Sequence, residues 1–140
     1  MERRFEIGND EIARIKRDLI LVIKEEHRIL FAYLHGSFGS LPFRDIDIAA
    51  YCKIDKDKVF DFELKTSSRL EIVAGYPVDF KVINDAPIGF QFSVIYEGKL
   101  FFERERGVRL DFLEETAMRY MDYYGFSRSF LRELVECTKK

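Results

Sequence analysis

Hydrophobic residues along this chain recur in two patterns, and the first of them is helical. In five segments the apolar positions are three or four residues apart, as on the buried face of an amphipathic helix. Residues that cap helices stand at several of the segment starts, and we expect Gly75 and Gly98 to end the second and third helices. We expect helices that start at Asn9 or Asp10, at Asp55 or Asp57, and at Asn84 or Asp85 with Pro87 near the first position, and two more over 108–123 and 127–137.

The second pattern consists of short, mostly apolar runs, which are typical of buried strands. Three such runs cover 28–34, 46–51 and 78–83, and a shorter apolar piece covers 100–102. Helices and strands therefore alternate, which predicts an α/β or α+β class. We expect a small mixed β-sheet with helices packed mainly on one face.

Length and composition indicate one folding unit. The chain has 140 residues, 47% of them hydrophobic and 34% charged, which is the balance of an ordinary globular domain. The sequence contains no internal repeat and no linker rich in proline, glycine or serine. We expect a single domain that spans residues 1–140.

Charge and cysteine content narrow the classes of partner. The formal net charge of −2 gives no electrostatic basis for binding nucleic acid directly, so we expect none. Cys52 and Cys137 lack the spacing of a metal site and fit reduced thiols of a cytoplasmic protein. No apolar stretch reaches the length of a membrane span, so we expect no membrane association.

Two aspartates open the second predicted strand. Asp45 and Asp47 are one residue apart, and side chains alternate along a strand, so both carboxylates face the same side. Asp47 is followed by Ile48 and two alanines, so its charge stands in an apolar run where an unpaired charge is costly. A divalent cation would relieve the repulsion between the two carboxylates.

A glycine and a serine stand where the first predicted strand ends. Gly36 allows a tight turn and a close approach of the backbone to a ligand. Successive N–H groups at such a turn can bind an anion, and the Ser37 hydroxyl adds a donor. A Gly-Ser pair alone is most often an ordinary turn, but this one precedes Asp45 by only seven residues, 38–44. The combination suggests a phosphate cradle beside a metal site.

The third predicted strand offers a third carboxylate. Asp79 lies between Val78 and Phe80 in an otherwise hydrophobic run. It is either a solvated carboxylate on an edge strand or a ligand that joins the first two aspartates. Three aspartates on adjacent strands would supply the hard oxygen donors that Mg²⁺ or Mn²⁺ prefers.

These motifs resemble those of the DNA polymerase β nucleotidyltransferase superfamily. The similarity rests on the stretches LHGSFGSLPFRDIDIAAY and YPVDFKVINDAP, and the later IYEGKLFFERERGVRLDFLEETAMRYMDYY also resembles one branch of it. That branch is the minimal, MNT-type group, whose members are antitoxin partners of HEPN-domain toxins. The resemblance extends over nearly the whole chain.

The resemblance implies a role for each matched residue. Gly36 and Ser37 match residues that hold the triphosphate of a nucleotide. Asp45 and Asp47 match carboxylates that bind two divalent ions, and Asp79 matches a third that shares one ion and helps to deprotonate the attacking hydroxyl. The implied activity is transfer of AMP from ATP to a tyrosine of a HEPN-type toxin, with Mg²⁺ or Mn²⁺ as cofactor.

The loop between the two motifs departs from the usual family pattern. It is shorter than usual, Phe38 stands where an arginine is common, and Arg44 stands where a serine is common. The Arg44 guanidinium suits phosphate oxygens, so it would replace part of the missing positive charge and contact the nucleotide.

Two other functions fit the same residues. The chain could be a binding antitoxin that neutralises its partner by contact, with the aspartates inactive or binding metal only. It could also modify a small molecule, although 140 residues leave little room for a separate acceptor domain. A neighbouring gene for a small helical HEPN protein would favour the toxin partner.

A few further residues have two interpretations each. Lys81 shares the face of Asp79 if the strand is regular, and it is either a phosphate contact or an edge lysine. His35 precedes Gly36, and a lone histidine in such a position is more often structural than catalytic. An aromatic group near the C-terminus could form a partner surface, although helical spacing favours core packing for two of its members, Tyr120 and Tyr124. The group comprises Tyr120, Tyr123, Tyr124 and Phe126.

Overall fold

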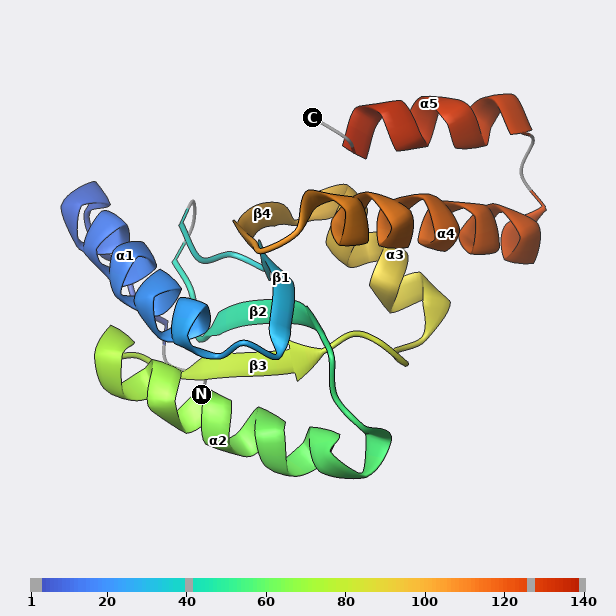
Figure 1. The fold of residues 1–140 in the computed structure, drawn as a ribbon. Coiled ribbons are helices and arrows are strands. Elements are labelled where there is room, and N and C mark those ends of the chain that lie inside the picture. The colour runs from blue at the N-terminus through green and yellow to red at the C-terminus, as the bar shows by residue number, and fades with distance from the viewer. Residues whose placement is uncertain (1–3, 40–41, 126–127, 139–140) are drawn as a thin grey trace.

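The computed structural model describes residues 4–39, 42–125 and 128–138. Helices and strands alternate along this part of the chain, as the hydrophobic pattern predicts (Figure 1). The helices are α1 (Asn9–Glu25), α2 (Val59–Ala74), α3 (Ile88–Glu97), α4 (Arg106–Tyr124) and α5 (Arg128–Thr138), with a short 3-10 turn, η1 (Lys56–Lys58), before α2. The strands are β1 (Ile29–His35), β2 (Ile46–Cys52), β3 (Val78–Val82) and β4 (Lys99–Glu103).

The four strands form one sheet with the order β3-β2-β1-β4. β1 runs antiparallel to both β2 and β4, whereas β2 and β3 are parallel. The parallel pair requires a crossover, which α2 supplies. The prediction of a mixed sheet in an α/β or α+β fold is therefore confirmed.

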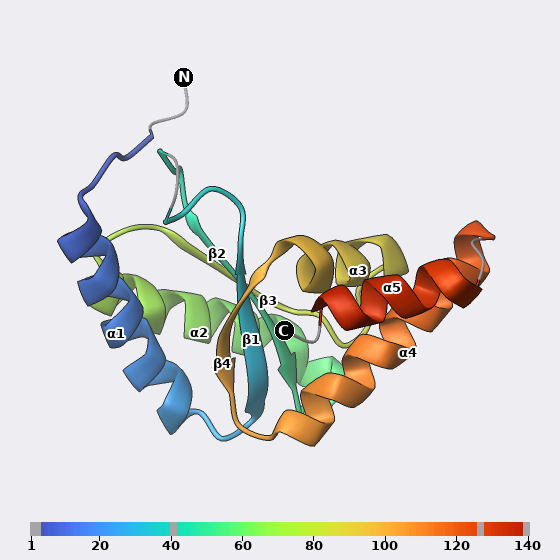
Figure 2. The same ribbon diagram turned by 90° about the horizontal axis from the view of Figure 1, so that it is seen from above.

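Helices cover both faces of the sheet, so the expectation that they pack mainly on one face is wrong. α1 and α2 lie on one side, and α3 and α4 lie on the other (Figure 2). Neighbouring positions of the central strands supply the two cores: Ile48 and Ala50 face α1 and α2, whereas Phe31 and Ala49 face α3 and α4. The apolar runs of the central strands have no polar face, so each side of the sheet needs a covering layer.

The predicted helix end at Gly75 is correct, whereas the polar caps predicted for the starts of α1 and α3 are wrong. α2 and α4 end at Gly75 and Gly125, both in the left-handed conformation that favours glycine. At the other ends, Gly8 and Pro87 occupy the N-cap positions of α1 and α3, and neither helix has a side-chain cap. A competing tertiary contact accounts for the start of α3: the Asn84 side chain, a predicted cap, instead accepts a hydrogen bond from the backbone of Cys52.

Side chains of α2 close the outer edge of β3. The N–H groups of Val78, Phe80 and Val82 donate hydrogen bonds of 3.0, 3.1 and 2.8 Å. Their acceptors are spaced four residues apart along one stripe of α2, so each meets an alternate residue of the strand. These acceptors are Glu71 Oε1, Ser67 Oγ and Glu63 Oε2. An edge that would otherwise be open to another strand is thereby covered.

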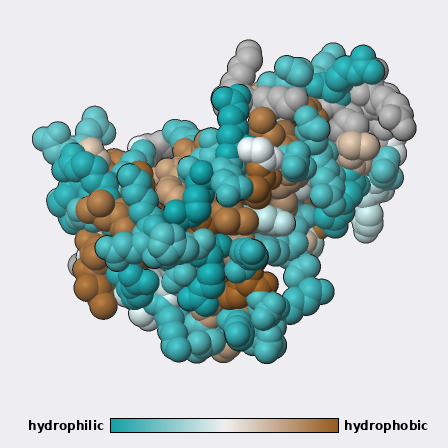
Figure 3. Space-filling view, viewed as in Figure 1, coloured by the Kyte–Doolittle hydropathy of each residue, from teal (hydrophilic) through white to brown (hydrophobic). Residues whose placement is uncertain are grey.

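The surface of the molecule is mostly hydrophilic in the view of Figure 3, with hydrophobic atoms gathered over α1 and α2 at its left. Exposed large hydrophobic residues on these helices are Leu21, Phe60, Leu64 and Ile72. Among the described residues, no helix combines the length and the hydrophobicity needed to cross a bilayer.

Candidate active site

The sheet register brings two of the predicted aspartates side by side. Asp47 on β2 and Asp79 on β3 are direct partners in the parallel pair. Both are on the face that α3 and α4 cover, because their strand neighbours Ile48 and Phe80 pack in the opposite core. Asp45 lies in the bend just before β2, and its charge acts on Asp47. The three aspartates therefore gather where β2 and β3 begin.

Electrostatics at this position penalise ionised carboxylates. Partial burial, with the negative charges of Asp45 and Asp79, raises the pKa of Asp47 to about 6, and Arg44 opposes the increase. Burial removes water from a carboxylate, and like charges nearby disfavour a second negative charge. Such clusters of destabilised charge are typical of functional sites.

Gly36 lies directly against the Asp47 carboxylate. The residue has φ +79°, and a Cβ atom built on it would be 2.5 Å from Asp47 Oδ2. No side chain fits there, and the left-handed backbone conformation also favours glycine. The turn that the sequence predicts as a phosphate cradle is therefore in van der Waals contact with the predicted metal ligand.

Cationic side chains flank the carboxylates. The Arg44 Nε atom is 3.8 Å from Asp45 Oδ2, and the Lys81 Nζ atom is 3.8 Å from Asp79 Oδ1. The side chains of Arg44 and Lys81 are 51% and 54% exposed, so both can exchange a carboxylate partner for a phosphate oxygen. Ser37, the other predicted nucleotide residue, is partly buried in the turn after β1.

His35 adds a polar group to the same face. It pairs with Asp47 across β1 and β2, and its ring meets Phe90 of α3 edge-on, with the two centroids 5.7 Å apart. Burial lowers the pKa of His35, and the charge of Asp79 works against that shift. Its Nε2 atom is buried without a hydrogen-bond partner, the one such side-chain atom among the described residues.

Aromatic packing anchors the loop that joins the two motifs. Phe38 is buried and packs edge-on against Phe43, with their ring centroids 4.9 Å apart. The N-terminal segment pairs with the same loop, because the Phe5 N–H donates to the Phe43 carbonyl at 2.7 Å and the Phe43 N–H donates to the Phe5 carbonyl at 3.0 Å. Phe38, in place of the arginine common in the family, therefore contributes to the hydrophobic core. Residues 40 and 41 of the loop are outside the described residues.

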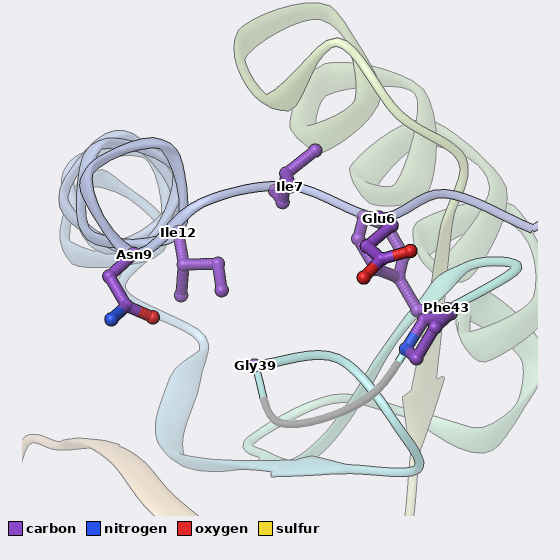
Figure 4. Close-up of a pocket in the computed structure, with 7 residues that line it drawn as sticks. Glu6, Ile7, Asn9, Ile12, Gly39 and Phe43 are labelled. Atoms are coloured by element: carbon purple, nitrogen blue, oxygen red, sulfur yellow. The ribbon is translucent and has the colours of Figure 1, made fainter.

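A small pocket of about 140 Å³ lies between the N-terminal segment, the start of α1 and this loop. In Figure 4, the Ile12 side chain projects into the space between the N-terminal segment and Gly39. None of the three aspartates lines the pocket. The pocket is therefore separate from the acidic site, and its lining residues support the loop.

The donor chemistry of the aspartates fits a divalent cation. Partly buried carboxylates that repel each other are stabilised when a hard cation binds them. The described residues contain no group of three His, Cys, Asp or Glu side chains positioned to hold one ion together. Asp47 is nevertheless next to both Asp45 and Asp79, whose charges act on it.

One basic residue near the loop was not found by sequence reasoning. Lys16 of α1 has its Nζ atom 3.9 Å from the position of a Cβ on Gly39, whose φ is +99°. Lys16 follows the buried Ile15 in α1. Nothing in the neighbouring sequence indicates a function for this lysine. Only the packing of α1 against the sheet brings this charge to the loop.

The tyrosines near the C-terminus divide between packing and exposure. Tyr120 stacks on Phe92 with 3.8 Å between ring centroids, so its predicted core role is correct. Tyr124 contacts Tyr120 but is 52% exposed, and Tyr123 is 73% exposed. Phe126, the last member of the predicted aromatic group, lies outside the described residues.

Comparison with solved structures finds the same fold in toxin–antitoxin complexes. A chain from the complex of the tri-AMPylated Shewanella oneidensis HEPN toxin with MNT antitoxin has 17% identity and a TM-score of 0.65, over 88% of this chain and 98% of that one. A toxin–antitoxin structure with AMP-PNP has 18% sequence identity and a TM-score of 0.65, over 85% of this chain and 97% of that one. A chain from the toxin–antitoxin MntA–HepT has 16% sequence identity and a TM-score of 0.63, over 86% of this chain and 96% of that one.

No curated protein matches the sequence. A family model does match it: residues 17–107 fit the model described as "Polymerase beta, Nucleotidyltransferase". The matched segment contains the Gly-Ser turn, all three aspartates and every strand of the sheet. The chain therefore belongs to the polymerase β nucleotidyltransferase family.

Proposed function

We propose that this protein transfers AMP from ATP to a tyrosine hydroxyl of a HEPN-type partner and thereby acts as the antitoxin of a toxin–antitoxin pair in the cytoplasm. The observation that carries the proposal is the contact of Gly36 with the Asp47 carboxylate, beside Asp79 on the next strand. A phosphate-binding turn against paired carboxylates is the arrangement that phosphoryl transfer requires. Two solved structures of the same fold support it: one is a complex of a tri-AMPylated HEPN toxin with MNT antitoxin, and the other is a toxin–antitoxin structure with AMP-PNP.

The residues divide into those that hold the nucleotide and those that hold metal. Backbone N–H groups at Gly36 and Ser37 would bind the triphosphate, and Arg44 would leave Asp45 to neutralise a phosphate oxygen. Asp45, Asp47 and Asp79 would hold Mg²⁺ or Mn²⁺. When bound, these ions neutralise charge on the phosphates and on the attacking oxygen.

Asp79 has the additional role of proton acceptor. The tyrosine oxygen forms a bond to the α-phosphorus while the bond from that phosphorus to the bridging oxygen breaks, and pyrophosphate leaves. The tyrosine hydroxyl loses its proton in this step, and Asp79, whose side chain is 47% exposed, accepts it.

The direct test is to mix the purified protein with the HEPN protein encoded beside its gene, ATP and Mg²⁺, and to measure intact masses. The proposal predicts that the partner gains one or more adenylate groups, located on a tyrosine by peptide sequencing. A partner that stays unmodified with every nucleoside triphosphate would contradict the proposed activity.

The buried side chain of Phe38 favours one alternative. In place of an arginine that could reach a phosphate, the loop has a phenylalanine packed in the core. A non-catalytic antitoxin would tolerate this change. If the partner stays unmodified but loses its toxic activity on binding, the contact mechanism replaces the enzymatic one.

A further inference from the structure

A second cavity lies on the same side of the sheet as the aspartates. It has a volume of about 370 Å³, within the range of small-molecule sites. The end of α5 returns toward β1 and β4 beside the end of α3, as Figure 2 shows, and helps to enclose it. Its lining includes Tyr33, Tyr96, Lys99, Leu100, Arg109 and Cys137.

The cavity is close to the acidic site along β1. Tyr33 lines it, and His35, two residues further along the same face, is the cross-strand partner of Asp47. Two residues of a strand span about 7 Å. A molecule with its phosphates at Gly36 can therefore reach the cavity with the rest of its length.

A buried cation gives the cavity a specific polar group. Arg109 is 6% exposed; its Nε donates to the carboxylate of Glu103, and its guanidinium hydrogen-bonds to Tyr33. Burial raises the pKa of the Tyr33 phenol, so Tyr33 is a neutral hydrogen-bonding group. Neither Arg109 nor Tyr33 has a role in the proposed transfer step.

The remaining wall combines aromatic and apolar side chains with the charged Lys99. Tyr96 is 48% exposed and stacks on Phe92, with ring centroids 5.5 Å apart, and Leu100 is 44% exposed. A planar guanidinium opposite aromatic and aliphatic side chains is well suited to a nucleobase, which presents flat faces and polar edges.

Strand order assigns opposite sides to the two substrates. Asp79, the proposed proton acceptor, lies on β3, and the cavity lies beside β4 at the other edge of the sheet. In-line transfer needs the attacking and leaving oxygens on opposite sides of the phosphorus. An acceptor that enters over β3 leaves the side of β1 and β4 to the nucleotide.

We propose that the cavity between β4, α3, α4 and the end of α5 holds the nucleoside part of the nucleoside triphosphate, with the base between Tyr96 and Arg109. The phosphates would then run along β1 to the turn at Gly36. This assignment rests on the proposed function and specifies how its nucleotide is bound.

Cys137 provides a native reporter of occupancy. It is exposed and lines the cavity, whereas Cys52 is buried and its thiol pKa is raised to about 12, so we expect Cys52 to react far more slowly. The experiment measures the rate at which N-ethylmaleimide modifies Cys137, by intact mass, with Mg²⁺ and a non-hydrolysable ATP analogue. At analogue concentrations ten times Kd, mass action predicts modification about tenfold slower than without it.

Pyrophosphate with Mg²⁺ is the control ligand, because it fills the phosphate turn and carries no nucleoside. It should leave the rate at Cys137 unchanged. Protection by pyrophosphate, or protection by the HEPN partner but not by the analogue, would overturn the assignment.

A pair of variants tests the base contact independently. Tyr96→Ala should weaken analogue binding by about tenfold, the loss expected for one stacking side chain, and leave pyrophosphate affinity unchanged. Tyr124→Ala, which removes an exposed aromatic outside the cavity lining, is the matched control and should bind both ligands normally.

The outcomes separate this assignment from the proposed function. If calorimetry detects Asp47-dependent binding of the analogue but Cys137 is not protected and Tyr96→Ala binds normally, the nucleoside lies elsewhere and only the cavity assignment fails. If the protein binds no nucleotide at all, the proposed activity and the assignment are both overturned.

Discussion

β3 lies between two polar environments that are built in opposite ways. Along its outer edge, three backbone N–H groups each find an acceptor on α2, from Glu63, Ser67 and Glu71. On its face toward α3 and α4, Asp79 lies beside another carboxylate, and the imidazole of His35 nearby contains a buried nitrogen without a partner.

The difference teaches which polar residues stabilise the fold and which are available for ligands. A buried N–H group with an acceptor costs little, whereas crowded carboxylates and an unpartnered nitrogen reduce stability. A fold retains such groups where a ligand supplies the missing charge or hydrogen bond. We therefore infer a structural role for the α2 edge and propose the acidic face as the functional one.

The largest expected effect is on the acidic face. Asp47→Ala should abolish metal-dependent ATP binding and leave the fold intact, because it removes one of the repelling carboxylates. Relief of this repulsion should also stabilise the ligand-free protein at pH 7, by roughly 1 kcal/mol after screening by solvent. Calorimetry and urea unfolding measure the two effects. Equal ATP affinity of variant and wild type, with and without Mg²⁺, would contradict the role of Asp47.

Asp79→Asn should separate catalysis from binding. The amide keeps the size of the side chain but cannot accept the proton of the tyrosine hydroxyl. We expect Mg-ATP and partner binding to persist while AMP transfer falls by about 10²- to 10⁴-fold, the usual contribution of a general base. Single-turnover labelling of the partner measures the transfer rate. A variant that labels its partner at the wild-type rate would exclude Asp79 as proton acceptor.

Gly36→Ala tests the contact between the turn and Asp47, and Gly75→Ala is a matched control. Both glycines have φ +79°, but a Cβ at Gly75 meets no atom within 4 Å. Both variants should lose roughly 1–2 kcal/mol of stability from backbone strain, whereas only Gly36→Ala should also lose nucleotide affinity. Urea unfolding and calorimetry compare them. Similar nucleotide affinity in the two variants would show that the Asp47 contact is unimportant.

On the α2 edge, Ser67→Ala should affect stability alone. It leaves the Phe80 N–H without its acceptor and should cost about 1 kcal/mol in urea unfolding. Ser68→Ala, at the exposed neighbouring position, should change stability little, and both variants should transfer AMP normally. A loss of activity in Ser67→Ala would break the distinction between a structural edge and a functional face.

The smallest effect is the pH dependence that Asp47 gives to stability. Its pKa is about 6 in the folded protein and near 4 in the unfolded chain, so the folded state binds its proton more tightly. The protonated Asp47 carboxyl therefore contributes stability that is fully present below pH 4 and is lost as the pH rises through 6. Unfolding of wild type and Asp47→Asn from pH 4 to 7.5 should show the variant gaining relative stability across this range. A constant difference would contradict the shifted pKa.

Local patterns in the sequence determined the elements and the chemistry. Alternating helical and strand-like runs set the fold class, and glycines such as Gly75 set helix ends, because both depend on neighbouring residues alone. The spacing of Asp45 and Asp47 placed two carboxylates on one side of a strand for the same reason. The family resemblance of the Gly-Ser and aspartate motifs agrees with the match to the nucleotidyltransferase model.

Only the tertiary structure decided what these groups contact. The sequence could not give the register that pairs Asp47 with Asp79, the approach of Gly36 to Asp47 Oδ2, or the cavity around Arg109. It also could not show that helices cover both faces of the sheet, or that acceptors on α2 close the edge of β3. These features arise between segments far apart in the chain, where packing and the partnering of buried polar groups select one arrangement among many that the local pattern allows.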